Sequence, residues 1–190
     1  MLYLIALTLG IFLGILAKGK ISNLMKIRFN KIWIILLAFL IDILSQVLAY
    51  RGFDFTVRYS FAISALKFCL LAVGFWVNRH YLGMLVIGAG CLLNALVMML
   101  NGGRMPVDEG LLKTIIPDAR IISALARDGK HVMANGDTRL FFLSDIFHPP
   151  GFLAIGAQIV SIGDLIVVAG LFLMIFQVVW GKEGSMGKHG

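Results

Sequence analysis

Five long apolar blocks constrain this sequence more than any other feature. They cover residues 2–17, 32–50, 59–77, 81–100 and 157–180. A helix needs roughly 20 apolar residues to cross the ~30 Å hydrocarbon core of a bilayer. The chain is 59% hydrophobic and 14% charged, whereas a soluble domain is about half apolar and a quarter charged. The sequence therefore predicts an all-α integral membrane protein with five transmembrane helices, in a single membrane domain over residues 1–190.

The basic residues predict the orientation. No positive charge of a signal peptide precedes the first block, so we interpret that block as a retained helix. The loop that follows it is dense in basic residues: Lys18, Lys20, Lys26, Arg28 and Lys31. Basic loops beside the first helix stay in the cytoplasm, which predicts an outside N-terminus and a cytoplasmic C-terminus. A count over all loops divides evenly, so this orientation depends on the first loop.

Residues 101–156 are the only large piece outside the blocks, and we predict that they form an external cap over the outer helix ends. "PDARIISALARDG" (117–129) predicts a short amphipathic helix on the membrane surface. "NGD" (135–137) is a turn signal, and we expect a hairpin tip there between "HVM" and "TRLFFL". "FFLSDIFHPPG" is expected to be a second interfacial segment. We expect a flexible tail at 181–190.

Charged groups inside the blocks are costly in lipid, and they mark functional positions. Asp42 in the second block and Lys67 in the third both lie nine positions from the outer ends of their helices. They therefore share one depth, and we expect an ion pair. The pair is either structural, fixing the helix register, or functional, as a proton or ion relay or a charged-substrate contact. Its burial alone gives no assurance of stability, because desolvation offsets the attraction.

A second group of polar side chains lies nearer the outside. Asn94 is in the fourth block and Asp164 in the fifth, with Ser161 and Gln158 close to the helical face of Asp164. We expect a polar cavity that opens outward, lined by Asp42, Gln46, Lys67, Asn94 and Asp164. The alternative is that these groups only form hydrogen bonds that join the helices.

The fourth block ends at "NGGRMP" (101–106). Gly102 and Gly103 are predicted to end the helix with positive φ. A helix cap does not require Arg104, which either extends to lipid phosphates or binds a carboxylate or phosphate. The same loop supplies Thr138, and we expect four charged residues to converge at the outer rim: Arg104, Arg139, Asp145 and Asp164.

Other chemistry finds little support. Cys69 and Cys91 both fall inside apolar blocks, where we interpret them as small buried hydrophobes. His131 and His148 have no metal-ligand spacing, and we interpret them as surface histidines. We therefore predict no metal, no cofactor and no nucleic-acid partner.

Three motifs occur together in the second half of the chain: "NGGRMPV" after the fourth block, "TRLFFLSDIF" in the loop and "SIGDLIVVAG" in the fifth block. With the five-block pattern, they resemble a bacterial multi-pass membrane protein family of unknown function. The resemblance covers nearly the whole chain, implies a bacterial integral membrane protein and transfers no activity. We expect the protein in the bacterial cytoplasmic membrane. It groups as one candidate set the residues in the shared motifs: Asn94, Asn101, Gly102, Gly103, Arg104, Pro106, Thr138, Arg139, Asp145 and Asp164.

Three classes of function remain open. The first is a binding or transport protein whose cavity holds a small anionic or zwitterionic molecule or a lipid headgroup, with Arg104 and Arg139 binding the anion and Asp164 as the counter-charge. The second is a structural or accessory subunit of a larger membrane complex. The third is a membrane enzyme that acts on a lipid-linked substrate, with Asp145 or Asp164 as the general base. The expected partners are accordingly the lipid bilayer, an anionic lipid or small molecule, and partner subunits.

Overall fold

The apolar blocks form helices in the computed structural model, which describes residues 1–115, 129–150 and 159–181. The long helices are α1 (Leu2–Leu16), α2 (Ile32–Tyr50), α4 (Ser60–Val77), α5 (Leu82–Leu100) and α8 (Ile162–Trp180). The shorter elements are η1 (Ile21–Lys26), α3 (Phe55–Arg58), β1 (Met105–Val107), α6 (Glu109–Ile115), β2 (His131–Met133) and η2 (Phe141–Leu143). The prediction of a mostly helical chain is confirmed, and the first four blocks match their helices to within one residue at each end.

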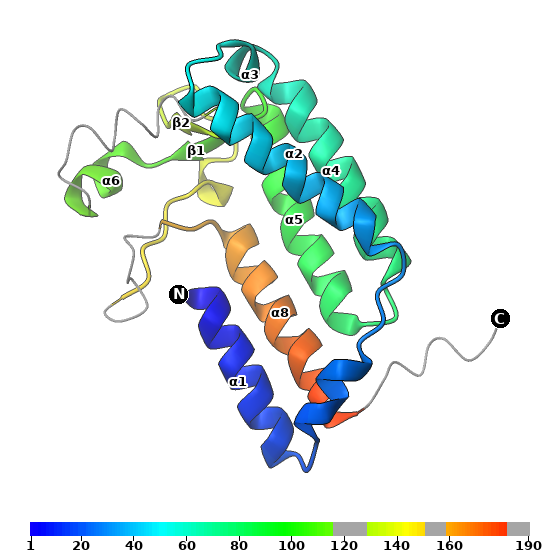
Figure 1. Cartoon of the computed structure of the whole chain (residues 1–190). Coiled ribbons are helices and arrows are strands. Elements are labelled where there is room, and N and C mark those ends of the chain that lie inside the picture. The colour runs from blue at the N-terminus through cyan, green and yellow to red at the C-terminus, as the bar shows by residue number, and fades with distance from the viewer. Residues whose placement is uncertain (116–128, 151–158, 182–190) are drawn as a thin grey trace.

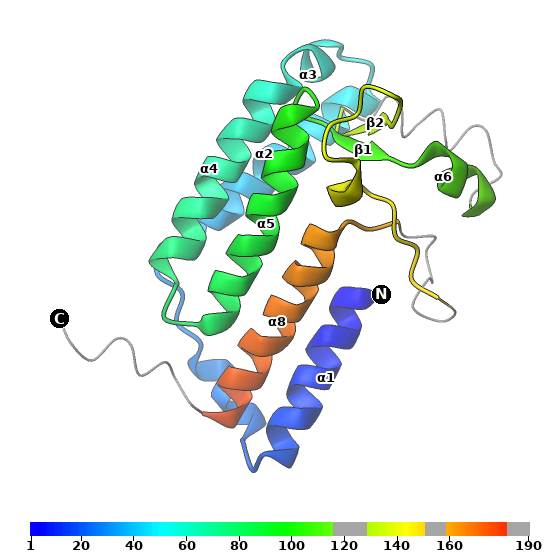
Figure 2. The ribbon, with the colours of Figure 1, turned by 180° about the vertical axis from the view of Figure 1, so that it is seen from behind.

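The long helices pack side by side in the order α1, α8, α5, α4, α2 (Figure 1). The N-terminus lies beside the start of α8, at the end of the bundle where β1 and β2 also lie, and α8 ends at the opposite end (Figures 1 and 2). Helices α1 and α2 stand at the two ends of the row. They are not among the described pairs of helices that pack closely, so the row is open on one side.

Four of these helices, α2, α4, α5 and α8, are long and apolar enough to cross a membrane. Large apolar side chains cover their outer surface; Leu36, Trp76 and Leu92 are each more than half exposed, as expected for side chains that face lipid. Helix α1 has 15 residues, which is about 22 Å at ~1.5 Å per residue and shorter than a ~30 Å hydrocarbon core. Four candidate spans are therefore established by length and composition, and α1 as a fifth span stays a prediction.

Glycines bring α5 and α8 close together. An added Cβ on Gly83 would collide with the carbonyl oxygen of Gly170, and one on Gly90 would lie 2.5 Å from that of Gly163. The two glycines on each helix are seven residues apart, a spacing that keeps them on one face. Small residues let helix backbones approach closely in a membrane. This contact fixes the start of α8 against α5, where Asn94 lies.

Helix α5 ends at the predicted glycine cap. Gly102 and Gly103 have φ values of +73° and +83°, and the Gly103 N–H donates to the Met98 carbonyl at 2.7 Å, as in a Schellman cap. Ser60 and Ser64 of α4 donate to the carbonyls of Gly102 and Gly103 at 2.9 and 2.7 Å. The glycine cap therefore also attaches the end of α5 to α4.

Beyond this cap, β1 pairs in parallel with β2, with Met105 opposite His131. The predicted hairpin between "HVM" and "TRLFFL" is therefore wrong, although "NGD" does contain a turn. The physical reason is that β1, from a distant part of the chain, supplies the edge for "HVM". Leu140 takes a left-handed conformation with φ of +52°, after which residues 141–143 form the short helix η2 instead of a strand.

Some predictions fall outside the described part of the chain. The amphipathic helix predicted for 117–129 lies there except for Gly129, and the tail predicted for 181–190 lies there except for Gly181. The described parts of 101–156 gather at the N-terminal end of the bundle (Figures 1 and 2). Their assignment as an external cap stays a prediction, because no membrane side is established.

Candidate functional site

A cavity of about 720 Å³ lies inside the bundle, a volume typical of small-molecule sites. All five long helices contribute to its wall, and residues of β1, α6 and β2 bound it at one end. Most of the residues that line it are apolar, and Tyr3 and Cys91 also belong to the lining. The described charged and amide side chains that line it are Asp42, Lys67, Asn94, Lys130, His131, Asp145 and Asp164.

An ion pair lines the cavity on the side of α2 and α4. The Lys67 Nζ lies 2.6 Å from the Asp42 Oδ1, and Gln46 donates from its Nε2 to the Asp42 Oδ2 at 2.8 Å. Lys67 is buried, and its Nζ lies 5.0 Å from the centre of the Phe68 ring. The structure thus brings together the two residues that share one helix depth. Gln46 contacts the pair without lining the cavity.

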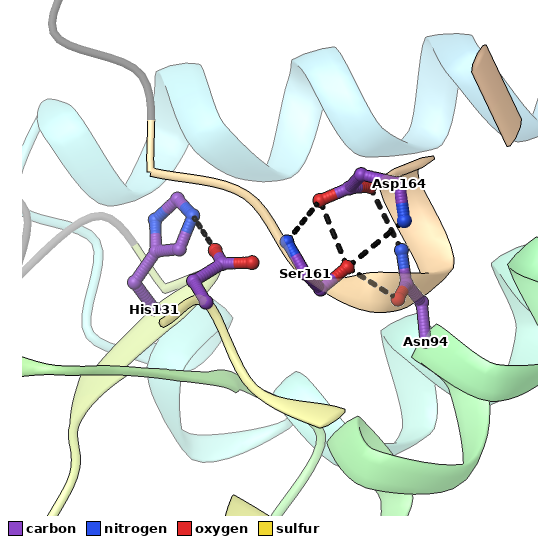
Figure 3. Close-up of polar contacts among 5 residues, drawn as sticks. Asn94, His131, Ser161 and Asp164 are labelled. Carbon is purple, nitrogen blue, oxygen red and sulfur yellow. Dashed lines mark hydrogen bonds and ion pairs between the residues drawn. The ribbon is translucent and has the colours of Figure 1, made fainter. Parts of the chain in front are cut away.

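Asn94 and Asp164 line the cavity on the side of α5 and α8, and they form a hydrogen-bonded network with Ser161 (Figure 3). Asn94 donates from its Nδ2 to the Asp164 Oδ1 at 2.9 Å, and the Ser161 Oγ donates to the Asn94 Oδ1 at 2.8 Å. Ser161 and Asp164 also form a capping box, in which each backbone N–H donates to the other side chain, at 3.0 and 3.1 Å. A capping box satisfies N–H groups that would otherwise lack partners in the first turn of a helix.

This capping box corrects the predicted start of the fifth block. The helix begins at Ile162 instead of residue 157, because Ser161 is extended and accepts a hydrogen bond from the first turn. Asp164 therefore lies in the first turn of α8, where a carboxylate is favourable at the positive end of the helix dipole. The pattern "SIGD" carries the signal for this cap, a serine followed three residues later by an acid.

Asp145 bounds the cavity from the end of the bundle. Its N–H donates to the Pro106 carbonyl at 3.0 Å and its carbonyl accepts from the Asp108 N–H at 3.1 Å, so its backbone is bound to the β1 segment. Its Oδ2 lies 3.9 Å from the His131 Nε2. Its Oδ1 is buried and has no hydrogen-bond partner among the described residues. An unsatisfied buried oxygen of this kind is uncommon in proteins.

The electrostatics of Asp145 follow from this placement. Burial first, and then the charge of Asp164, raise the pKa of Asp145 to about 8, while Lys130 acts in the opposite direction. At neutral pH its carboxyl group therefore carries a proton in most molecules. This state lowers the cost of burying the group, but it leaves the Oδ1 without a hydrogen-bond partner among the described residues.

Four of the residues predicted to bind a ligand are not among those that line the cavity: Asn101, Arg104, Thr138 and Arg139. The Asn101 side chain donates to the Arg139 carbonyl at 2.9 Å and accepts from its N–H at 3.0 Å, so these two residues meet through the Arg139 backbone. Thr138 accepts from the Asn135 N–H at 2.9 Å in an exposed turn. Arg104 is half-buried, immediately before β1. Their role as ligand-binding residues stays a prediction.

Two cavity residues were missed in the sequence. His131 has a side chain only 19% exposed and lines the cavity, so its interpretation as a surface histidine is wrong. Lys130 also lines the cavity. Both positions result from the pairing of β2 with β1, which joins segments far apart in the chain. No local motif in the sequence indicates this pairing.

The cavity offers charge and hydrogen bonding rather than an evident metal centre. Within the described ranges, no group of three or more His, Cys, Asp or Glu side chains is arranged to hold a metal ion. Among the described residues, the charged groups that face the cavity belong to three aspartates and two lysines: Asp42, Asp145, Asp164, Lys67 and Lys130. Such groups in an otherwise apolar wall suit a ligand that is partly polar and partly apolar.

The fold and the cavity define a helical membrane protein with a mostly apolar cavity inside its bundle that carries a few charged groups. The chain belongs to a family of unknown function, DUF5317, whose sequence profile matches residues 26–176. It is similar to an uncharacterized protein of Thermotoga maritima, with 28% identity over 172 residues that cover 90% of this chain and 86% of that relative. No solved structure matches the chain. The resemblance to a family of unknown function is thereby confirmed.

Proposed function

We propose that the chain binds an amphiphilic molecule in this cavity, as a membrane binding protein or as the binding part of a transporter. The zwitterionic headgroup lies among the polar side chains, and the apolar part extends toward the lipid. We further propose that the N-terminus lies outside, that α1 is a fifth span, and that residues 101–156 cap the outer end of the bundle. In this orientation the headgroup site lies in the outer half of the bacterial cytoplasmic membrane.

The observation that carries the proposal is open volume next to charged groups. Protein interiors are normally close-packed, and the α5–α8 contact in this chain follows that rule through its glycines. A structural ion pair such as Asp42–Lys67 needs no adjoining space, yet both residues line a cavity of about 720 Å³. Charges in a membrane are costly, and those kept beside a cavity usually contact a substrate or ion.

The open side of the helix row supports a lateral route into the cavity. Leu2 and Tyr3 of α1 and Phe39 of α2 line the cavity, and these two helices are not among the described pairs that pack closely. An apolar chain that leaves the cavity between α1 and α2 would reach lipid without crossing a packed interface. This route favours an amphiphile over a fully water-soluble molecule.

The test compares two tryptophan variants on one helix. Val168 lines the cavity, whereas Leu165 on the same helix is exposed. The full chain is purified from membranes in mild detergent, and its bound molecules are counted by native mass spectrometry. We expect about one retained amphiphile per chain in the wild type and in Leu165→Trp, and loss of that molecule in Val168→Trp. The same bound species at the same stoichiometry in Val168→Trp contradicts the proposal.

A structural or accessory subunit is the alternative, and one observation favours it. Asn94, Ser161 and Asp164 satisfy one another and join α5 to α8, as groups with only a structural role would do. In that case Asn94→Ala and Asp164→Asn lower the stability of the chain without changing its bound molecules. A partner subunit that copurifies at fixed stoichiometry, with no retained amphiphile, would favour this alternative.

A further inference from the structure

We propose that the amphiphile carries a protonated amine, which donates a hydrogen bond to the Oδ1 of Asp145 and lies between the carboxylates of Asp145 and Asp164. This inference rests on the proposed function and names its ligand class. It replaces an anionic headgroup with a cationic or zwitterionic one. The argument depends on which cavity groups already have partners.

The charge balance of the cavity favours a cation. Three aspartates and two lysines face it, which leaves one net negative charge when His131 is neutral and all carboxyl groups are ionised. Lys67 already forms an ion pair with Asp42, at 2.6 Å. The other two carboxyl groups, on Asp145 and Asp164, lie at the end of the bundle with Lys130. When Asp145 is ionised, one negative charge is therefore in excess there, and an anion placed between the two carboxylates would meet like charge.

The hydrogen-bond partners of each carboxyl group indicate where the ammonium group of the ligand would bind. Both oxygens of Asp42 accept hydrogen bonds, from Lys67 and Gln46. Both oxygens of Asp164 accept as well, from neutral donors on Asn94 and Ser161. The Oδ1 of Asp145 differs, because it is buried and lacks a hydrogen-bond partner within the described residues. A ligand with a hydrogen-bond donor would satisfy this atom.

The surroundings of the Asp145 Oδ1 indicate which kind of donor a ligand should supply. A buried carboxylate is stabilised most by a donor that also carries positive charge. A primary ammonium group supplies both, with three N–H donors, as in lysine. A quaternary ammonium has the charge without the N–H, and an alcohol has the donor without the charge. The arrangement at Asp145 therefore distinguishes a protonated amine from its two nearest analogues.

Such an amine has two sources in a membrane. It belongs either to a bilayer lipid with an ethanolamine headgroup or to a free alkylamine that partitions into the bilayer. Both have the chemistry required here, an ammonium group on an apolar chain. Both also reach the cavity through the side between α1 and α2, whose residues Tyr3 and Phe39 line it.

The test measures binding of matched amphiphiles to the full chain in detergent, by native mass spectrometry and by thermal unfolding. One arm compares dodecylamine with dodecyltrimethylammonium and dodecanol. The second arm compares phosphatidylethanolamine with phosphatidylcholine of the same acyl chains. We expect the primary amine to bind at least tenfold more tightly than its analogues in one arm or both. Preference in only one arm identifies the source, and equal binding of amines and analogues in both arms overturns the proposal.

A carboxamide variant tests the position. Asp145→Asn keeps the shape of the side chain and removes its charge, and we expect it to weaken amine binding at least tenfold. Asp137→Asn changes an aspartate in an exposed turn and is expected to bind the amine like the wild type. Unchanged amine binding in Asp145→Asn overturns the proposal. Thermal unfolding without ligand confirms that each variant is folded.

The pH dependence of amine binding gives a second test of the role of Asp145. Burial raises the pKa of Asp145 to about 8, so below that pH the amine must displace a proton. Apparent affinity is reduced by the fraction of molecules in the competent, ionised form, so it should rise about tenfold from pH 6 to pH 7 and level off above pH 8. An alkylamine stays protonated throughout this range. The slope should disappear in Asp145→Asn, and an unchanged slope there overturns the assignment.

Other charged or titratable groups that face this site need control. They are Lys130 just before β2, His131 in β2, Asp164 on α8, Cys91 on α5, Tyr3 on α1 and the Asp42–Lys67 pair. Loss of a proton from His131 acts in the same direction as ionisation of Asp145. A His131→Gln variant should therefore retain most of the slope. If the slope disappears in His131→Gln and persists in Asp145→Asn, His131 is the titrating group and the proposal fails.

The two proposals fail in different ways. If Val168→Trp removes bound amphiphiles but amines show no advantage, the cavity binds amphiphiles and only the amine assignment is wrong. If Val168→Trp leaves all binding unchanged, the cavity itself is not the site, and both proposals are wrong.

Discussion

Replacement of Asp42 and Lys67 together is expected to be far less destabilising than replacement of either residue alone. The Lys67 Nζ is 2.6 Å from the Asp42 Oδ1, and unit charges at that separation attract by roughly 6 kcal/mol at an effective dielectric constant of about 20. Removal of both charges from water costs several kcal/mol per ion, so the net contribution of the pair is small. Loss of one partner leaves the other charge buried, which typically costs about 3–5 kcal/mol.

The perturbation is a cycle of Asp42→Leu, Lys67→Met and the double variant. Asp42→Leu should be the more harmful single change, because it leaves the Lys67 side chain, only 11% exposed, without a counter-charge. Lys67→Met leaves an Asp42 side chain that is 22% exposed and still bonded to Gln46. We expect a loss of about 3 kcal/mol or more for Asp42→Leu, and a double variant within about 1 kcal/mol of the wild type.

The assay is reversible unfolding in mixed micelles of dodecyl maltoside and sodium dodecyl sulfate, followed by circular dichroism. The Glu109–Lys113 pair provides the matched control, because its charges lie 2.8 Å apart but its side chains are 46% and 61% exposed. Lys113→Met should change stability by less than about 0.5 kcal/mol. If the losses in the Asp42–Lys67 cycle simply add, the two charges do not compensate each other and the reasoning is refuted.

Three further predictions concern packing, protonation and access. Gly163→Ala should destabilise the chain by about 1–3 kcal/mol, because the added Cβ would collide with α5. Gly88→Ala makes only ordinary contacts and should be neutral or stabilising by up to about 1 kcal/mol. The same unfolding titration measures both variants. Because the pKa of Asp145 in the folded chain is raised to about 8, its contribution to stability is present at low pH and is lost as the pH rises from about 4 to about 8. The thermal unfolding temperature should therefore fall across this range, and the fall should be smaller in Asp145→Asn. In a Cys69→Ser chain, Cys91 should react with N-ethylmaleimide because it lines the cavity. The larger polyethylene-glycol maleimide should react with Cys91 only after denaturation. If intact mass shows that neither reagent reacts with the folded chain, the cavity is closed.

The helices were predictable because hydropathy and helix rise are local quantities. Block boundaries came directly from runs of apolar residues, and four of the five match the helices to within one residue. A constant rise per residue also placed Asp42 and Lys67 at one depth, and the structure brings them into contact. The prediction needed no knowledge of side-chain packing, because adjacent antiparallel helices bring equal depths together.

The start of α8 shows where hydropathy fails. Residues 157–161, "AQIVS", are apolar enough to extend the block, yet the helix begins at Ile162. Hydropathy reports the tendency to leave water, whereas a helix start depends on which groups satisfy the first N–H donors. Ser161 and Asp164 supply those groups, and the capping pattern was available in the sequence as a signal separate from hydropathy.

The end of the bundle was the hardest part to predict, and the proposed ligand class depends on it. Arg104, Arg139 and Asp145 belong to the same long loop in the sequence, which favoured an anion site. In the structure, neither is among the residues that line the cavity, while Lys130 and His131 reach it through a strand pairing that no local pattern indicates. The carboxylates therefore face the cavity without the arginines. This loss of expected positive charge is the physical reason why the proposed headgroup changes from an anion to a protonated amine.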